Sequence, residues 1–204
     1  MNKELEKRMY FFVPYNLSPI QQAIQAGHAA LEYARKYKDD EEFIDFADNW
    51  KTWVILNGGT TNSKGKTGAN YRKDEEPYFG TLDNLAHQLI KNDIKYSLFN
   101  EPDLNDALTA VCFICDERVF NYEDYPDFTQ FILDADIDNK SREFFDRYQL
   151  DKKLYRKSLE ELITIFPDQY LKWTTSLGGE KNVFLRNLLK GKKLAKCIDH
   201  RIRN

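Results

Sequence analysis

No apolar run in this sequence approaches the roughly 20 residues that a helix needs to span a bilayer, so no membrane-spanning helix is expected. Cysteine is scarce too: the 204 residues contain three, and a small odd number argues against a disulfide framework. The start of the chain mixes acidic and basic side chains and lacks the apolar centre of a signal peptide. These absences predict a cytoplasmic protein without a membrane partner.

A strong excess of charge of either sign is also missing. The chain has 30 lysine and arginine residues against 33 acidic ones, which gives a net charge of −3. This balance argues against strong nonspecific binding of nucleic acid, although a local basic patch could still bind it. The apolar fraction of 42% and the aromatic fraction of 14% are typical of a folded chain with a substantial core.

Hydrophobic patterning predicts an α/β fold for the first part of the chain. Four short apolar runs have the length and the flanking turn residues of buried strands: Met9–Val13, Thr52–Leu56, Ile94–Phe99 and Leu108–Ile114. Helical spacing predicts helices between them, over residues 19–37, 41–50 and 81–91. This order predicts a small mixed four-stranded sheet with flanking helices in a domain of residues 1–118. Residues 119–204, rich in aromatic and charged side chains, predict an α-helical C-terminal extension.

The first predicted helix starts with a serine cap and a proline in its first turn. Ile20, Ile24 and Leu31 fall on one side of it at helical spacing. We therefore expect the helix to pack on the sheet through these three side chains, with Gly27 allowing close approach.

A column of polar residues lies beside that apolar stripe. Gln21, Gln25 and His28 fall within roughly 60° of each other on a helical wheel. Polar groups at the edge of a buried face are costly unless they are hydrogen-bonded, so these residues are candidates for a site. Two plainer interpretations stay open: His28 as a structural histidine, and Gln21 as the residue that closes a capping box with Ser18.

The second candidate segment follows the third predicted strand. Residues 101–106 read Glu-Pro-Asp-Leu-Asn-Asp and place carboxylates and amides at a strand end, where open α/β sheets commonly bind ligands. The alternative is an ordinary turn, because proline, aspartate and asparagine are turn residues.

Two further patterns are rejected. The run Thr60–Thr67 ends like a phosphate-binding loop, but the required first glycine falls at Thr60 and no amphipathic helix follows. Cys112 and Cys115 have the spacing of half a zinc site. Residues three apart in a strand point to opposite faces, and there is no second pair, so we expect both to be core thiols.

The two candidate segments together resemble the type-2 peptidyl-tRNA hydrolases. That family has a strand and then a helix with the pattern Gly-Lys-x-x-x-Gln-x-x-His-Ala, and residues 20–29 here read Ile-Gln-Gln-Ala-Ile-Gln-Ala-Gly-His-Ala. The family's later Asp-x-Gly-x-Thr-Gln … Thr-Val segment falls over residues 101–111, Glu-Pro-Asp-Leu-Asn-Asp-Ala-Leu-Thr-Ala-Val. The resemblance covers roughly residues 9 to 116.

The departures from the family pattern concern the site itself. The family's helix lysine is Gln21 here, its aspartate is at best Glu101, and its Thr-Gln pair is replaced. The connection Gly58–Phe79 also looks longer than the family's. The sequence looks closest to a divergent branch found in bacteriophage genomes, which would place the protein in the host cell cytoplasm.

The resemblance implies hydrolysis of an ester on tRNA or a related RNA end, without a cofactor. It implies catalytic roles for four residues: Glu101 or Asp103 as the base, His28 as proton carrier or orienter, and Thr109, with Gln25, as a donor to the oxyanion. The remaining predicted ligand contacts are Gln21, Asn105, Lys64 and Lys66. Two alternatives stay open: a cleft that binds or degrades a small nucleotide or modified RNA in counter-defence, and a non-catalytic partner-binding protein. A homo-oligomer is possible under each.

Overall fold

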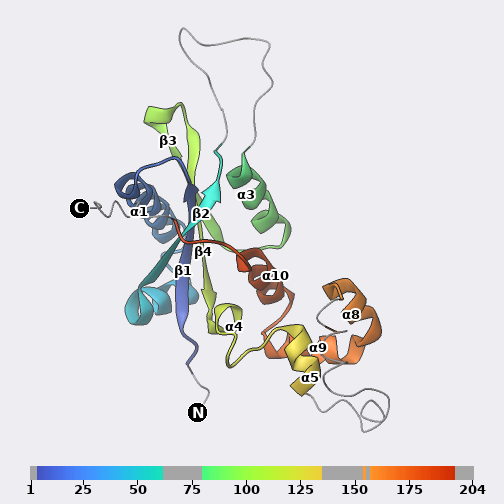
Figure 1. Cartoon of the computed structure of the whole chain (residues 1–204). Coiled ribbons are helices and arrows are strands. Elements are labelled where there is room, and N and C mark those ends of the chain that lie inside the picture. Colours follow the sequence, from blue (N-terminus) through green and yellow to red (C-terminus); the bar gives the residue numbers. More distant parts are fainter. Residues whose placement is uncertain (1–3, 62–79, 135–153, 155–156, 196–204) are drawn as a thin grey trace, which may run out of the picture. The chain divides into compact units, whose positions relative to one another are not determined.

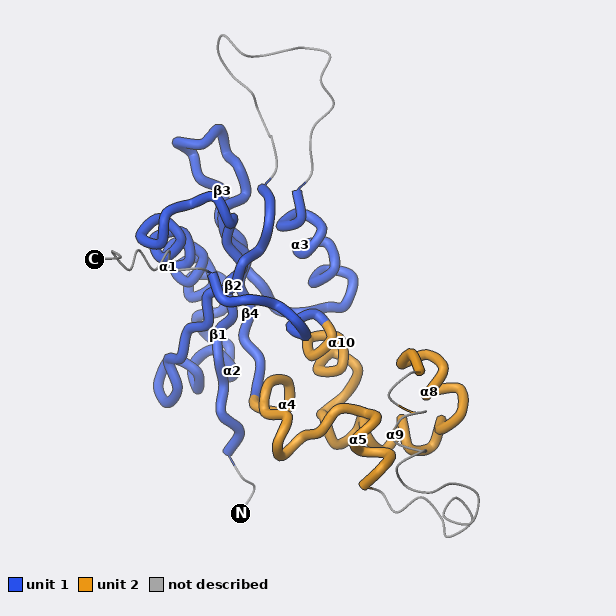
Figure 2. Tube along the Cα trace, in the orientation of Figure 1, with its two compact units in different colours: residues 1–116, 188–204 blue, residues 117–187 orange. Residues whose placement is uncertain are grey.

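The computed structural model of the chain describes residues 4–61, 80–134, 154 and 157–195 (Figure 1). The chain forms two compact units (Figure 2). The first comprises Met1–Asp116 and Leu188–Asn204, and the second comprises Glu117–Asn187. The expected boundary at residue 118 lies close to the observed one, whereas the return of the chain from residue 188 to the first unit was not expected. No helix in the described ranges is long and apolar enough to cross a membrane.

A four-stranded mixed sheet forms the centre of the first unit, as predicted. Its strands are β1 (Lys7–Pro14), β2 (Thr52–Gly59), β3 (Tyr96–Glu101) and β4 (Ala107–Asp116), in the order β2-β1-β4-β3. β1 pairs in parallel with β2, and β4 pairs antiparallel with both β1 and β3. The two central strands are the most apolar, and every residue of β4 except the last is buried. β2 and β3 therefore form the edges of the sheet.

The two described cysteines are part of this core, as expected. Cys112 and Cys115 are free and buried in β4. Burial raises the pKa of the Cys112 thiol to about 12, because a thiolate would lose its hydration inside the sheet. No group of His, Cys, Asp and Glu residues suited to a metal ion occurs in the described part of the chain.

Three helical segments accompany the sheet. They are α1 (Pro19–Lys36), the pair α2 (Glu41–Asp45) and η1 (Phe46–Trp50), and α3 (Thr81–Lys91). α3 has the predicted bounds. The segment predicted as one helix over residues 41–50 changes instead to a π-helical turn at Phe46 and ends at Lys51, which has a left-handed φ of 57°.

The prediction of which side of α1 faces the sheet was wrong. Ile20, Ile24 and Leu31 are 74%, 49% and 70% exposed, and a Cβ added to Gly27 would meet nothing within 4 Å. The buried residues of this helix are Gln22, Gln25, Ala26, Ala29 and Tyr33. Two alanines let the helix lie close to the strands, and the sheet and its loops supply hydrogen-bond partners for the two glutamines. Gln22, for example, donates to the carbonyl oxygen of Pro14 at 3.3 Å.

The end of the described chain lies along the outer edge of β2 and forms an isolated antiparallel β-bridge with it. The amide of Asn57 donates to the carbonyl of Lys193, and the amide of Ala195 donates to the carbonyl of Ile55, both at 3.0 Å. Leu194 lies antiparallel to Leu56 between these two bonds. The first unit is thus completed by residues that follow the second unit in the sequence.

The described elements of the second unit are all helices, as predicted for the extension. They are α4 (Glu117–Phe120), α5 (Phe128–Asp134), α8 (Leu159–Ile165), α9 (Pro167–Ser176) and α10 (Glu180–Leu189, which ends in the first unit). Their core is built around Phe128, Ile132 and Trp173. Arg186 is 3% exposed, and its guanidinium donates to the carbonyls of Arg118 and Tyr125 at 2.7 Å each. It thereby ties α10 to α4 and to the segment that follows α4.

Candidate functional site

Three polar side chains from three elements of the first unit form one hydrogen-bonded cluster around Gln25. The side-chain amide of Gln25 donates from Nε2 to Oε2 of Glu101 at 2.6 Å. Its Oε1 accepts a hydrogen bond from the hydroxyl of Thr109 at 2.5 Å. We call Gln25, Glu101 and Thr109 the Gln25 cluster. The predicted meeting of the first helix with the segment at residues 101–109 is therefore present.

A β-bulge places Thr109 in the cluster. The pairing of β3 with β4 shifts between Phe99, which is opposite Ala110, and Asn100, which is opposite Leu108. Thr109 is thus the extra residue of β4, and a bulge residue is free to re-aim its side chain. Ala110 and Cys112 pack in the core with Ala26 and Ala29 of α1, so simple alternation would turn Thr109 away from that helix. The bulge turns it back toward Gln25.

The three residues of the Gln25 cluster differ in burial, and this difference indicates which of them can contact a ligand. Thr109 is 1% exposed and Gln25 is 6% exposed, while Glu101, the last residue of β3, is half-buried. The Thr109 hydroxyl has a single proton and gives it to Gln25, so this residue orients the amide and is too buried to contact a ligand. Among the described residues, Oε1 of Glu101 has no hydrogen-bond partner. That oxygen is the part of the cluster that can accept a proton.

His28 adjoins the cluster through an aromatic contact. Its imidazole stacks on the ring of Phe99 with the centroids 4.4 Å apart and the planes 20° from parallel. Phe99 lies two residues before Glu101 on the same strand, so the stack holds the half-buried imidazole beside the strand end. The ring nitrogens make no hydrogen bond to any residue in the described ranges, which leaves them open to solvent or a ligand. The sequence had given no sign of Phe99 beyond its place in a strand.

Other predicted site residues lie apart from this cluster. Gln21 is exposed and closes the capping box with Ser18: each residue's backbone amide donates to the other's side chain, at 3.0 and 3.3 Å. Asp103 is exposed on the short 3-10 helix η2 (Pro102–Leu104), and its carboxylate bonds to no other described residue. Asn105, the residue that follows η2, is exposed and has a left-handed φ of 55°. Lys64 and Lys66 are outside the described residues.

The base of the long connection between β2 and α3 is held next to Thr109. The hydroxyl of Thr61 donates to the carbonyl of Leu108, the residue before the bulge. The hydroxyl of Thr81 donates to the carbonyl of Gly58 at 2.5 Å and accepts from the amide of Thr60 at 2.7 Å. A Cβ on Gly80 would lie 2.3 Å from the carbonyl oxygen of Thr60, so only glycine fits there. The two ends of the connection, at Thr60 and Thr81, are therefore bonded to each other, and Thr61 bonds to the start of β4.

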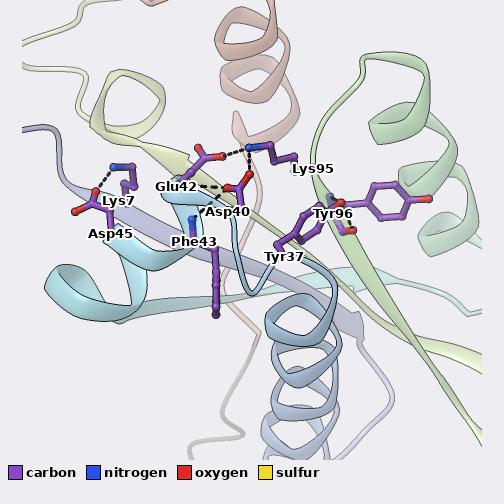
Figure 3. A network of polar contacts seen from close by, with 8 residues as sticks. All are labelled: Lys7, Tyr37, Asp40, Glu42, Phe43, Asp45, Lys95 and Tyr96. Carbon is purple, nitrogen blue, oxygen red and sulfur yellow. Dashed lines mark hydrogen bonds and ion pairs between the residues drawn. The ribbon is translucent and has the colours of Figure 1, made fainter.

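A second polar network lies at the other end of α1 and serves the fold (Figure 3). Lys95 donates to Asp40 at 2.6 Å and lies 3.6 Å from a carboxylate oxygen of Glu42. The hydrogen bond from Lys95 lowers the pKa of Asp40, whereas burial raises the pKa of Glu42. Asp40 also caps α2 through the amides of Glu42 and Phe43. These contacts fix the turn after α1.

Comparison with known proteins adds no family to this geometry. Neither protein-family models, nor curated proteins, nor solved structures gave a match to the chain.

Proposed function

We propose that the Gln25 cluster and His28 hydrolyse an ester at the end of a tRNA or a related RNA, with a peptide or similar acyl group as the other product. The observation that supports this proposal is the chain of hydrogen bonds from Thr109 through Gln25 to Glu101, whose ends come from distant parts of the sequence. Such a chain orients a carboxylate that is still partly open to solvent. The resemblance to the type-2 peptidyl-tRNA hydrolases supplies the substrate class.

In the proposed reaction, Oε1 of Glu101 accepts a proton from a water molecule as the water oxygen attacks the ester carbonyl carbon. Negative charge then develops on the carbonyl oxygen. The second N–H of the Gln25 amide and the imidazole of His28 are the nearby donors for that charge. The carbon–oxygen bond to the ribose breaks, Glu101 returns its proton to the leaving ribose oxygen, and the acyl group leaves as an acid.

Lysines at the end of the described chain are suited to hold the RNA. Lys190, Lys192 and Lys193 are exposed and lie close together in the sequence. Lys193 pairs with Asn57 near the end of β2, and β2 runs parallel to β1. β3 also runs parallel to β1, because both pair antiparallel with β4, so β2 and β3 finish at the same end of the sheet. A local basic segment of this kind can bind phosphates although the whole chain has a net charge of −3.

The test compares two carboxylates that are two residues apart. Glu101→Gln should lower the rate of peptidyl-tRNA hydrolysis by about 100-fold or more, the usual effect of losing a general base. Asp103→Asn removes an exposed carboxylate outside the cluster and should leave the rate within about threefold of the wild type. Thermal melting of both variants checks that the fold is retained.

Two further variants test the rest of the site. His28→Ala should lower the rate, and Thr109→Val should do so as well, whereas Thr109→Ser keeps the hydroxyl and should restore most of it. Equal rates for Glu101→Gln and Asp103→Asn would exclude Glu101 as the base. A wild-type protein that releases no acyl group from peptidyl-tRNA would exclude the hydrolase and favour a binding function for the same residues.

A further inference from the structure

The outer edge of β3 carries backbone groups that the sheet does not use. Tyr96 turns both its amide and its carbonyl away from β4: the amide donates to the Tyr37 hydroxyl at 3.2 Å, and the carbonyl accepts from that hydroxyl at 3.1 Å (Figure 3). Lys36 also donates to this carbonyl at 3.1 Å. Backbone groups of an antiparallel strand alternate in direction, so the amide and carbonyl of Leu98 point to the same outer edge. No described residue pairs with them.

A surface groove lies along this part of the edge. It has a volume of about 280 Å³ and is lined by Glu32, Arg35, Lys36, Tyr96, Ser97 and Leu98. One wall is therefore the C-terminal half of α1, and the other is the open edge of β3. The hydroxyl of Ser97 is turned inward and donates to the carbonyl of Ala29 at 2.6 Å, so it holds the strand against the helix. The groove is a preformed space beside the outer edge of β3, which has no partner strand among the described residues.

The groove and the Gln25 cluster are on one strand. β3 ends at Glu101, three residues after Leu98, which is roughly 10 Å at the usual rise of a strand. A chain that paired with β3 at Leu98 and continued in the same direction would bring its next residues to Glu101 and His28. The C-terminal residue of a peptide esterified to RNA has to reach that point.

We propose that the open edge of β3 binds the peptide part of the ester substrate as an added parallel strand. This inference rests on the proposed function and names the half of the substrate that the groove recognises. The amide of Leu98 donates to one peptide carbonyl, and its carbonyl accepts from the amide two residues further along the peptide, which is the pairing of parallel strands. The backbone amide and carbonyl of Tyr96 are already hydrogen-bonded to Tyr37 and Lys36, so the added strand cannot pair with β3 at Tyr96.

This mode of binding has a consequence for selectivity. Backbone hydrogen bonds form with any peptide, whatever its side chains. A hydrolase that acts on peptidyl esters of varied sequence requires this kind of recognition. An ester with a single amino acid cannot reach Leu98 and gains nothing from the groove. The rate should therefore rise with peptide length until about four residues are present.

The first experiment uses Leu98→Pro and the matched variant Leu98→Ala. Proline removes the outward amide, and an edge strand tolerates it because that amide makes no bond within the sheet. The substrates are N-acetyl-alanyl-tRNA and N-acetyl-tetra-alanyl-tRNA. The wild type and Leu98→Ala should cleave the longer ester about 3- to 10-fold faster than the shorter one at low substrate concentration. In Leu98→Pro this difference should be lost, so that the two esters are cleaved at equal rates.

A second measurement keeps the inference testable if Leu98→Pro does not fold or if the protein cleaves neither ester. The probe is a non-cleavable amide of N-acetyl-tetra-alanine with 3′-amino-3′-deoxyadenosine, added to the folded wild-type chain. Its binding should slow hydrogen exchange of the Leu98 amide, and N-methylation of the peptide amide that faces the Leu98 carbonyl should abolish this effect. Binding without hydrolysis would overturn the proposed enzyme and keep the groove. Hydrolysis with the same length dependence in Leu98→Pro, or a probe that leaves the Leu98 amide unprotected, would overturn the groove.

Discussion

The two sides of α1 differ in a way that reverses the usual amphipathic helix. Its inner side is built from alanine, tyrosine and two glutamines, while isoleucine and leucine lie on the outer side. The difference shows that fit to the sheet decides which side is buried. Small side chains permit close packing between the helix and the sheet. A buried side-chain amide is tolerated where hydrogen-bond partners are present. Gln22 bonds to the carbonyl of Pro14, and Gln25 bonds to Glu101 and Thr109.

The largest effect should come from truncating the inner side. Tyr33 is 1% exposed, and its ring lies 4.5 Å from that of Tyr37 and 5.8 Å from that of Phe43. Tyr33→Ala should therefore lower the free energy of unfolding by about 3–5 kcal/mol, as large aromatic truncations do. Urea unfolding followed by circular dichroism measures this. A loss below about 1 kcal/mol would mean that the side taken as buried is not packed in solution.

An intermediate effect is expected at the turn after α1, where the exposed Lys95 donates to Asp40. Lys95→Met should cost at most about 1 kcal/mol, because half-exposed ion pairs are screened by water. The pKa of Asp40 is lowered in the folded chain, so its contribution is present above the ordinary carboxyl pKa of about 3.9 and is lost as pH falls through the lowered value. The difference between wild type and Lys95→Met should accordingly shrink in acid.

Urea unfolding of the wild type and Lys95→Met at pH 7 and at pH 2.5 measures this difference. The raised pKa of Glu42 works in the opposite direction, since protonation of that buried carboxyl favours the folded state as pH falls. A difference that grows in acid would show that Lys95 stabilises the turn by packing and not by charge.

The smallest effect should come from the outer side of α1. Ile24→Gln and Leu31→Gln exchange exposed apolar groups for polar ones of similar length, so each should change the free energy of unfolding by no more than about 0.5 kcal/mol. Thermal melting and sedimentation at two protein concentrations measure stability and association together. A loss above about 1 kcal/mol that depends on concentration would show that a second copy of the chain covers this side.

The sequence was sufficient for the elements whose pattern is local. The apolar runs of β1 and β4 and the helical spacing of α3 depend on neighbours a few residues away, and these elements formed where predicted. The packing of α1 depends instead on partners far along the chain, 76 residues away for Glu101 and 84 for Thr109. The bulge that brings Thr109 to Gln25 could not be predicted, because no residue type near it indicates a bulge. Which of the two carboxylates, Glu101 or Asp103, bonds to Gln25 depends on where β3 ends, and a turn-like sequence does not specify this.

The β-bridge that residues 193–195 make with β2 has a consequence for synthesis on the ribosome. The four strands of the sheet are complete by Asp116, but the outer edge of β2 gains its backbone partners only after residues beyond the second unit have emerged. At about 5–20 residues per second, this delay lasts several seconds. During that time the amide of Asn57 and the carbonyl of Ile55 are open to any other extended chain nearby. This edge of β2 is therefore protected only after residues 193–195 have joined it, later than the rest of the sheet.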